Sequence, residues 1–295
     1  MLDYHIHTNF SDGRDHIVEI IRGAIDKGLT EFGISDHFTI VPIDPIELKL
    51  DPTWSHKHSD CNTLTYEFLK GGFSEAYSMK KSRLGEYFYT IGLAKEFYKD
   101  KLNLKAGIEL EYFPENWDEL CKMLEEYPLD YIIGGVHKNP NGNNYNHICD
   151  PGIYQTFTEE EYIDFAKTNL ELIIDMAKTG KCDIIAHAEC VCSYRKFSDF
   201  SLLNDHFTEL AKAVKNNGMC IEMNCWENPQ NIDPNHFLYK ECARLDIPVI
   251  ITSDAHWVKY INCGFERGMK ILKECGVKHT ATYDKRKQSI GDIKY

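Results

Sequence analysis

Apolar and polar positions along the chain follow two patterns, and together they predict strands that alternate with helices. Residues 2–8 alternate with a period of two, which is typical of a strand, and residues 15–27 carry their apolar side chains on one stripe, which is typical of a helix. The same succession recurs to the end of the chain. Further strands are expected at 31–35, 104–112, 131–136, 183–186, 219–224 and 248–252, and further helices at 85–101, 117–126, 158–178, 202–217, 236–245 and 265–274.

This alternation predicts an α/β fold. Seven strands, nearly all followed by a helix, indicate a parallel sheet with right-handed crossovers. The pattern by itself leaves two architectures open, a closed (β/α) barrel and an open doubly wound sheet. No shift in composition marks a domain boundary, so one domain is expected over residues 1–295.

One segment, at about 40–83, interrupts the pattern. Pro42, Pro45 and Pro52, and then Gly71 and Gly72, break any long element there. We interpret the segment as an irregular insertion that runs over the surface, and as a candidate substrate lid. A polar tail from residue 280 is expected to add a short strand.

Composition places the chain among globular proteins. Hydrophobic residues make up 43% of it and charged residues 27%. No apolar run approaches the roughly 20 residues of a membrane helix, and no secretory signal is visible, so we expect a cytoplasmic location without membrane contact. The eleven cysteines are an odd number and most lie in apolar or helical stretches, so reduced thiols are expected.

The charge balance narrows the expected partners. Lys and Arg number 33 and Asp and Glu 46, a net charge of −13. This argues against a nucleic-acid platform, which would present a basic face. An anionic substrate would need local cations to reverse the field, and bound metals would do so. A small-molecule partner is therefore expected, and the sequence carries no sign of an oligomeric state.

The candidate chemistry lies at the ends of the predicted strands. His5 and His7 are two residues apart, so both project from one face of the first strand. Such a pair alone is equally compatible with an exposed edge strand. Six further imidazoles and carboxylates follow later strands, at His37, Glu109, His137, His187, Asp254 and His256.

The carboxyl ends of parallel strands meet at one face of a barrel or in one crevice of an open sheet, so these side chains are expected to converge. Desolvating so many polar groups without a partner would be costly. They exceed the needs of one four-coordinate zinc ion, which indicates two or three metals. Nitrogen and oxygen donors without a thiolate suit Zn²⁺, Fe or Mn²⁺ better than Ca²⁺ or Cu(I).

The order of the motifs adds a resemblance. HxH, SDG, SDH, GIE, a strand-end VH, a strand-end AH and SDAH, from His5 to His256, resemble the PHP (polymerase and histidinol phosphatase) family. The resemblance implies a distorted (βα)₇ TIM-like barrel that usually holds three metals. It also implies nine ligands, which are His5, His7, Asp12, His37, Glu109, His137, His187, Asp254 and His256.

Asp12 is the least obvious member of this set. Many histidinol phosphatases place a His one residue further on, where this chain has Gly13, whereas other branches of the family use the Asp of SDG. Length and layout, including residues 105–113 and 131–137 and the insertion, are most similar to histidinol-phosphate phosphatases of the HisK type. This resemblance implies hydrolysis of L-histidinol phosphate, in histidine biosynthesis, by a metal-bridged hydroxide.

Further roles are hypotheses about single residues. Asp254 or His256 would protonate the leaving alkoxide. Arg195, in the loop after His187, is a candidate phosphate clamp, with a solvated surface arginine as the alternative. Lys138 is a second candidate for binding the phosphate.

Two carboxylates are expected to support ligands without binding metal. Glu111 shares a strand face with Glu109 and would hold a neighbouring ligand in place. Asp36 precedes His37 and is expected to orient a neighbouring group.

Three other functions compete with the phosphatase. The first is a phosphoesterase of the same family that acts on a nucleotide or another small phosphate ester. The second is an open-sheet, metal-dependent deacetylase or amidohydrolase. The third is a non-catalytic accessory module of a polymerase, against which the intact ligand set argues.

Overall fold

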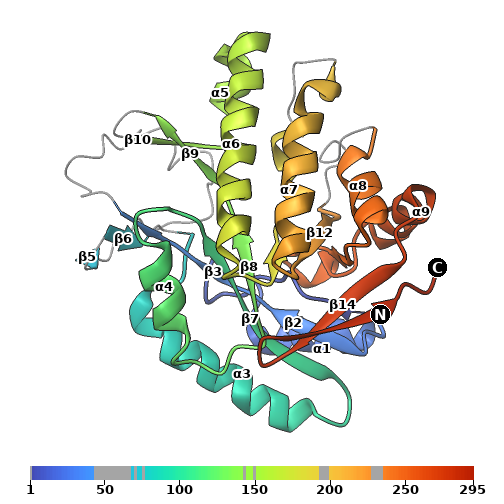
Figure 1. Ribbon diagram of the computed structural model, residues 1–295. Coiled ribbons are helices and arrows are strands. Elements are labelled where there is room, and N and C mark those ends of the chain that lie inside the picture. The colour runs from blue at the N-terminus through green and yellow to red at the C-terminus, as the bar shows by residue number, and fades with distance from the viewer. Residues whose placement is uncertain are drawn as a thin grey trace.

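The computed structural model describes residues 2–42, 68–69, 72–74, 77–141, 144–148, 151–192, 199–226 and 235–295. Within these residues, seven parallel strands pair in the order of the chain and form a nearly closed barrel (Figure 1). They are β1 (Leu2–Asp3), β2 (Glu31–Ile34), β7 (Asn103–Glu111), β8 (Tyr131–Gly135), β11 (Ile184–Ile185), β12 (Cys220–Asn224) and β13 (Val249–Thr252). A doubly wound sheet would reverse its strand order, so the distorted (βα)₇ barrel is confirmed and the open sheet is excluded.

The barrel closes between its first and last strands through few contacts. Ile6 forms a single parallel bridge with Ala255, and the His7 N–H donates to the Ala255 carbonyl at 3.0 Å. The buried Asp3 carboxylate extends this seam, because it accepts from the Ser253 N–H at 3.1 Å and from the Ser253 hydroxyl at 2.5 Å. Side-chain bonds thus replace part of the ladder at this seam.

The first strand is shorter than the sequence pattern predicts. Regular pairing of β1 ends at Asp3, whereas a strand was expected over residues 2–8. Tyr4 belongs to the cluster inside the barrel, and the next residue, His5, also reaches carboxylates of the interior. The alternation therefore shifts by one residue between Tyr4 and His5, although His5 and His7 still lie side by side, with ring centroids 5.1 Å apart.

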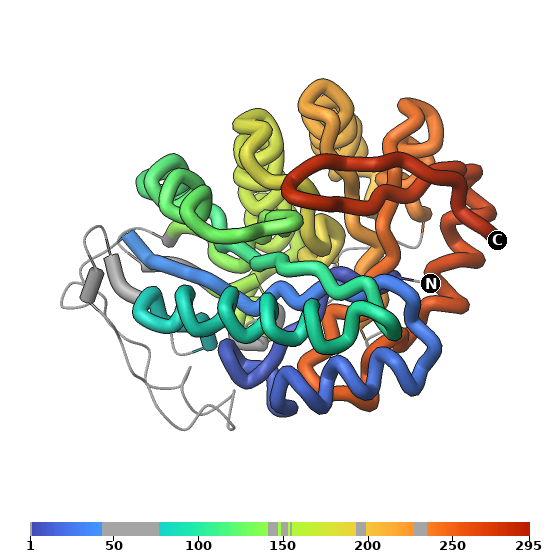
Figure 2. Tube along the Cα trace, turned by 90° about the horizontal axis from the view of Figure 1, so that it is seen from below, coloured from blue at the N-terminus to red at the C-terminus, as the bar shows by residue number. Residues whose placement is uncertain are grey.

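Helices surround the barrel (Figures 1 and 2). They are α1 (Ile17–Asp26), α3 (Leu84–Tyr98), α4 (Trp117–Leu124), α5 (Pro151–Thr156), α6 (Glu159–Thr179), α7 (Asn204–Asn216), α8 (Phe237–Leu245) and α9 (Phe265–Cys275). Short 3₁₀ turns lie at Lys81–Arg83, Cys190–Cys192, Phe200–Leu203 and Val258–Tyr260. The helix α6 begins with the expected capping box, in which the Thr158 side chain accepts from the Glu161 N–H.

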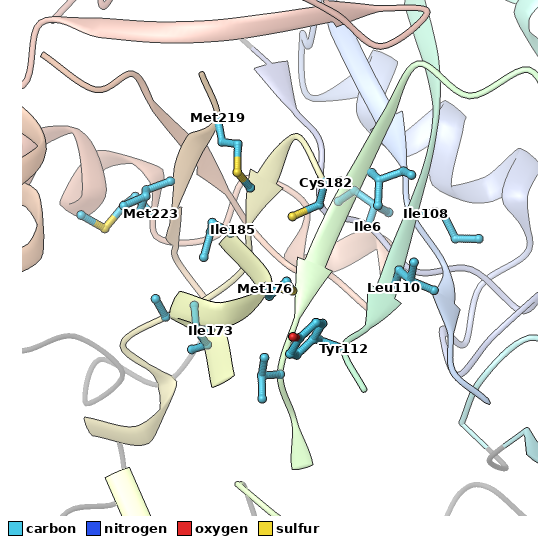
Figure 3. Close-up of a cluster of buried hydrophobic side chains, with 14 of the residues drawn as sticks. Ile6, Ile108, Leu110, Tyr112, Ile173, Met176, Cys182, Ile185, Met219 and Met223 are labelled. Atoms are coloured by element: carbon cyan, nitrogen blue, oxygen red, sulfur yellow. The ribbon is translucent and has the colours of Figure 1, made fainter. Parts of the chain in front are cut away.

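The outer face of the barrel packs on these helices. Ile108 and Leu110 of β7 and Ile185 of β11 belong to one buried cluster with Ile173 and Met176 of α6 (Figure 3). Because side chains alternate along a strand, burying this set outward turns the intervening residues of β7 inward. The hydrophobic periodicity therefore aims the polar residues of the strands at the barrel interior.

A second, smaller cluster fills the barrel below the polar residues. Tyr131 stacks on Tyr4 with ring centroids 4.8 Å apart, and Tyr283 packs beside them. Tyr283 comes from a hairpin of β14 (His279–Asp284) and β15 (Lys287–Asp292), which lies across this end of the barrel (Figure 2). The polar tail thus forms two paired strands, one more than the sequence predicts.

The segment after β8 differs from the sequence-based expectation. The sequence pattern predicts no strand between 137 and 157, yet β9 (Lys138–Asn141) and β10 (Asn144–His147) form an antiparallel pair there. The pair of Asn141 and Gly142 is a hairpin signal that the composition of the segment obscured.

The insertion expected at about 40–83 is described only in part. β3 (His37–Phe38) precedes the insertion and pairs with β7, and the described part of the insertion contains a small sheet of β4 (Ile40–Val41), β5 (Phe68–Leu69) and β6 (Gly72–Ser74). Its stretch 43–67, and with it the lid hypothesis, lies outside the described residues. In the part of the chain that the structure describes, no helix is both long and apolar enough to span a bilayer.

Substituting Gly107 by Ala is expected to lower the free energy of unfolding by about 1–3 kcal/mol, because a Cβ there would overlap the Tyr131 ring inside the barrel. Denaturant unfolding measures the change. Gly85→Ala is the matched control: its Cβ would meet nothing within 4 Å in α3, so a gain of about 0.4–1 kcal/mol is expected. Equal effects at both glycines would contradict this account of the interior.

Candidate metal centre

The buried carboxylate of Glu109 lies at the middle of the polar cluster. Its Oε2 is 2.7 Å from His37 Nδ1 and 3.1 Å from His5 Nε2. Its Oε1 is 3.0 Å from His187 Nε2 and 3.5 Å from His137 Nε2. Glu109 is 1% exposed, so four imidazoles from four segments of the chain surround one desolvated carboxylate.

Strand register brings these side chains together. His37 opens β3 and pairs directly with Glu109 of β7, while His137 and His187 follow β8 and β11. Seven non-glycine residues of the described chain have a positive φ, and two of them belong to this cluster, His187 with a φ of 21° and Asp254 with a φ of 51°. Residues other than glycine rarely adopt such backbone angles, and those that do are often found at functional sites.

A second group lies beside the first, toward the opening. The His7 ring is sandwiched between His37 and His256, with ring centroids 4.2 Å away on each side. Asp12 Oδ1 lies 3.3 Å from His256 Nε2 and 3.9 Å from His37 Nε2. Asp254 joins the two groups, because its Oδ1 is 3.0 Å from His7 Nε2.

The turn that carries Asp12 is held by Asp36. The Asp36 carboxylate accepts from the Thr8 N–H at 2.7 Å and from the Ser11 hydroxyl at 2.6 Å. Gly13 packs so tightly that a Cβ would overlap the backbone of His7. A side chain at position 13 does not fit this turn, and it is Asp12 that approaches the histidines.

Donor atoms gather in three overlapping groups within the described residues. In each group the candidate ligand atoms all lie within 4.8 Å of one another. The groups are His7, Asp12, His37 and His256; His5, His7 and Asp254; and His37, Glu109 and His137. His187 belongs to none of them, although it contacts Glu109.

Divalent cations fit this arrangement. Four buried atoms of this cluster have no hydrogen-bond partner: His5 Nε2, His7 Nδ1, Asp12 Oδ1 and Glu109 Oε2. Such atoms are costly unless something satisfies them, and imidazole and carboxylate lone pairs aimed at one space are satisfied by a metal. The chain therefore has the donor set for divalent metals.

The charges of the cluster are strongly coupled. Burial opposes the charged form of Glu109, yet the surrounding histidines outweigh burial and hold its pKa well below the usual range. Burial and the neighbouring imidazoles lower the pKa of His7 to about 3. Burial also opposes the charge of His256, but Asp12 and Asp254 prevail and raise its pKa to about 9.

Two carboxylates support ligands from behind. Glu111 Oε2 lies 2.6 Å from His137 Nδ1, and Glu111 Oε1 accepts from the backbone N–H of the same histidine at 2.7 Å. Glu222 of β12 lies 2.5 Å from His5 Nδ1. Sequence reasoning missed Glu222 and its neighbour Asn224. The available signal was a carboxylate and an amide two residues apart in an otherwise apolar strand.

Two basic residues, Lys138 and Arg195, are candidates for binding the phosphate of a substrate. Lys138 is buried beside His137, with its Nζ 5.7 Å from the centroid of the Tyr77 ring. Arg195 lies outside the described residues. The assignment of either to a phosphate group therefore stays a prediction.

Comparison with known proteins gives one family. A sequence model of the PHP domain matches residues 3–225. A probable histidinol-phosphatase of Deinococcus radiodurans is 22% identical over 97% of this chain and 98% of its own length. A histidinol-phosphatase of Bacillus subtilis is also 22% identical, over 90% of this chain and 96% of its own.

A solved structure has a similar fold. It is the histidinol phosphate phosphatase of Lactococcus lactis, determined in complex with zinc, L-histidinol and phosphate. The TM-score is 0.74 at 20% identity, and the match covers 98% of each chain. The likeness over the full length of both chains agrees with the barrel described above.

Metal binding is expected to tighten as the pH rises from 6 to 8.5. The pKa of His256 in the fold is about 9, above the unfolded value of about 6.5. Its charge therefore stabilises the metal-free chain below about pH 6.5, and this contribution is lost as the pH rises toward 9. A cation takes the lone pair that the proton leaves.

The measurement is the rise in Tm that saturating Mn²⁺ produces at each pH. The rise should be larger at pH 8.5 than at pH 6, because tighter binding stabilises the fold more. A rise that is equal at both pH values, or larger at pH 6, would show that metal binding displaces no proton from the cluster.

Proposed function

Because this chain belongs to the PHP domain family, we propose that it is a metal-dependent phosphatase that hydrolyses L-histidinol phosphate. The observation that carries the proposal is the cluster around Glu109, where nine imidazole and carboxylate side chains converge and four buried donor atoms have no hydrogen-bond partner. The relatives named histidinol-phosphatase, which match nearly the whole chain, support the choice of substrate.

The three donor groups suit two or three ions, and nitrogen and oxygen donors suit Zn²⁺, Fe or Mn²⁺. The ions deeper in the barrel would be held by six residues, His5, His7, Glu109, His137, His187 and Asp254. The ion nearer the opening would be held by Asp12, His37 and His256. Divalent ions held there would supply an activated water as the nucleophile at neutral pH and would stabilise negative charge on the phosphoryl oxygens.

The protein side chains orient the reaction. Glu109 contacts ligands of both groups, so it keeps them at a constant separation. Asp254 and His256 are 16% and 18% exposed, whereas His5 and His7 are fully buried. A substrate at the opening can therefore touch Asp254 and His256. Of the two, His256 would donate the proton that the leaving alkoxide needs, because its pKa is raised to about 9, whereas neighbouring histidines outweigh burial and hold the pKa of Asp254 well below its usual range.

The acidic chain needs cations to hold a phosphate ester. Lys138 supplies one such charge beside His137, and the Tyr77 ring lies close to its ammonium group. Arg195 is proposed as the second, because a guanidinium binds phosphate oxygens in pairs. Both would lower KM more than they raise kcat if they contact the ground state and the transition state alike.

The substrate is tested by assaying the Mn²⁺- or Zn²⁺-loaded protein against histidinol phosphate and a panel of nucleotides and sugar phosphates. We expect kcat/KM for histidinol phosphate to exceed that of every other ester by at least about 100-fold, because an enzyme that recognises polar groups of its substrate rejects compounds without them by even larger factors. A higher kcat/KM for a nucleotide or another small ester would overturn the proposed substrate but not the proposed phosphatase activity.

Replacing His7 by Ala is expected to lower kcat by at least ~100-fold without unfolding the barrel, because His7 belongs to two of the three donor groups. Circular dichroism and Tm check the fold, and bound metal is measured on the same sample. His279→Ala, in the hairpin at the other end of the barrel, is the matched control and should keep its activity. Near-normal turnover of the His7 variant would refute the role of His7.

A further inference from the structure

Glu222 is the one fully buried carboxylate of β12, and it accepts hydrogen bonds from several strands. It is 1% exposed. Its Oε1 lies 2.5 Å from His5 Nδ1 and 2.6 Å from the Thr252 hydroxyl, and its Oε2 accepts from the backbone N–H of His187 at 2.6 Å. The Asn224 amide lies 3.3 Å from the same Oε2.

None of the three donor groups found among the described residues includes Glu222, so its place is behind the ligands. We propose that Glu222 is a positioning residue of the metal centre, which fixes the tautomer of His5 and holds His187 and Asp254 in place. The inference rests on the metal centre of the proposed function and adds to it a residue that acts only through other side chains.

The first step of the argument concerns the tautomer of His5. An ionised carboxylate only accepts hydrogen bonds, so His5 Nδ1 must donate to Glu222. The neutral ring then carries its lone pair on Nε2. That atom has no hydrogen-bond partner and lies 3.1 Å from Glu109 Oε2 and 3.5 Å from Asp254 Oδ1. A carboxylate behind a histidine in this way orients the ring and raises its basicity toward a metal.

The second step concerns the other oxygen of Glu222. It accepts a hydrogen bond from the backbone N–H of His187. The φ of His187 is 21°, a backbone angle that residues other than glycine rarely adopt. This bond helps to hold the backbone in the conformation that places the His187 ring 3.0 Å from Glu109. Asn224 then extends the network, because its amide nitrogen also donates to Asp254 Oδ2 at 3.0 Å.

The network is selective. Among the described contacts, no hydrogen bond or ion pair joins Glu222 to His7, Asp12, His37 or His256, the members of the group near the opening. A change at Glu222 should therefore act on the group that contains His5 and Asp254 and leave the opening group intact.

The test replaces Glu222 by Gln, which keeps the size but turns one oxygen into a donor. The amide cannot accept from His5, Thr252 and His187 together, so His5 loses its fixed tautomer. Co²⁺ is titrated into the metal-free chain, and affinity and visible absorption are measured for each class of site. We expect the site that contains His5 and Asp254 to bind Co²⁺ about 10–100-fold more weakly in Glu222→Gln, with an altered spectrum. The opening group should bind Co²⁺ as in the wild type.

Two variants calibrate the titration. Asp12→Asn replaces a charged oxygen donor of the opening group by a neutral amide and should weaken binding at the opening group, which Glu222→Gln leaves intact. Asp183→Asn removes a mostly buried carboxylate at the opposite end of the barrel, where it pairs with Arg286, and should change neither class. If Glu222→Gln lowers only the stability of the metal-free chain and binds Co²⁺ like the wild type, Glu222 is merely structural and the proposal falls.

A measurement on the wild-type chain covers the case in which Glu222→Gln does not fold. In the Zn²⁺-loaded protein, ¹⁵N NMR of the histidine rings should show the proton of His5 on Nδ1; a proton on Nε2 would overturn the proposal. A wild-type chain that binds no divalent metal would overturn this inference and the proposed function together. Metal binding by the wild type with an unaffected Glu222→Gln would overturn the positioning role alone.

Discussion

The structure depends on one buried charge, the carboxylate of Glu109. A desolvated carboxylate is tolerated only where opposite charge or hydrogen bonds compensate for the lost water. Here four imidazoles approach it from four segments of the chain, and the barrel must close for all of them to reach it. The same convergence that makes the carboxylate tolerable leaves buried donor atoms without hydrogen-bond partners, which makes the site suitable for metals.

The interior of the barrel is divided along its axis by the polarity of its side chains. Stacked tyrosines, Tyr4 and Tyr131, and the hairpin residue Tyr283 fill one end, and glycines in β2 and β7 make room for the Tyr131 ring. The other end holds the histidines and carboxylates. Apolar packing at one end thus supports a costly polar cluster at the other, while side chains on the outside of the strands pack under the helices.

Three buried carboxylates hold the candidate metal ligands in position. Asp36 holds the turn of Asp12, Glu111 holds His137, and Glu222 holds His5. Each of these acids accepts from backbone N–H groups as well as from side chains, so each ties a ligand to the position of a strand end. In the proposed metal centre, candidate ligands fixed in this way would keep their geometry when a substrate enters.

The strands, helices and eight strand-end ligand candidates could be predicted from the sequence, because hydrophobic periodicity and parallel topology dictate which strand ends meet. The tertiary structure alone decided three matters. The shift between Tyr4 and His5 lies next to Asp3, whose carboxylate accepts from Ser253 across the barrel seam, and no local pattern records such a contact. The exclusion of a side chain at Gly13 arises from its packing on the His7 backbone. The role of Glu222 follows from contacts between residues 217 positions apart in the chain.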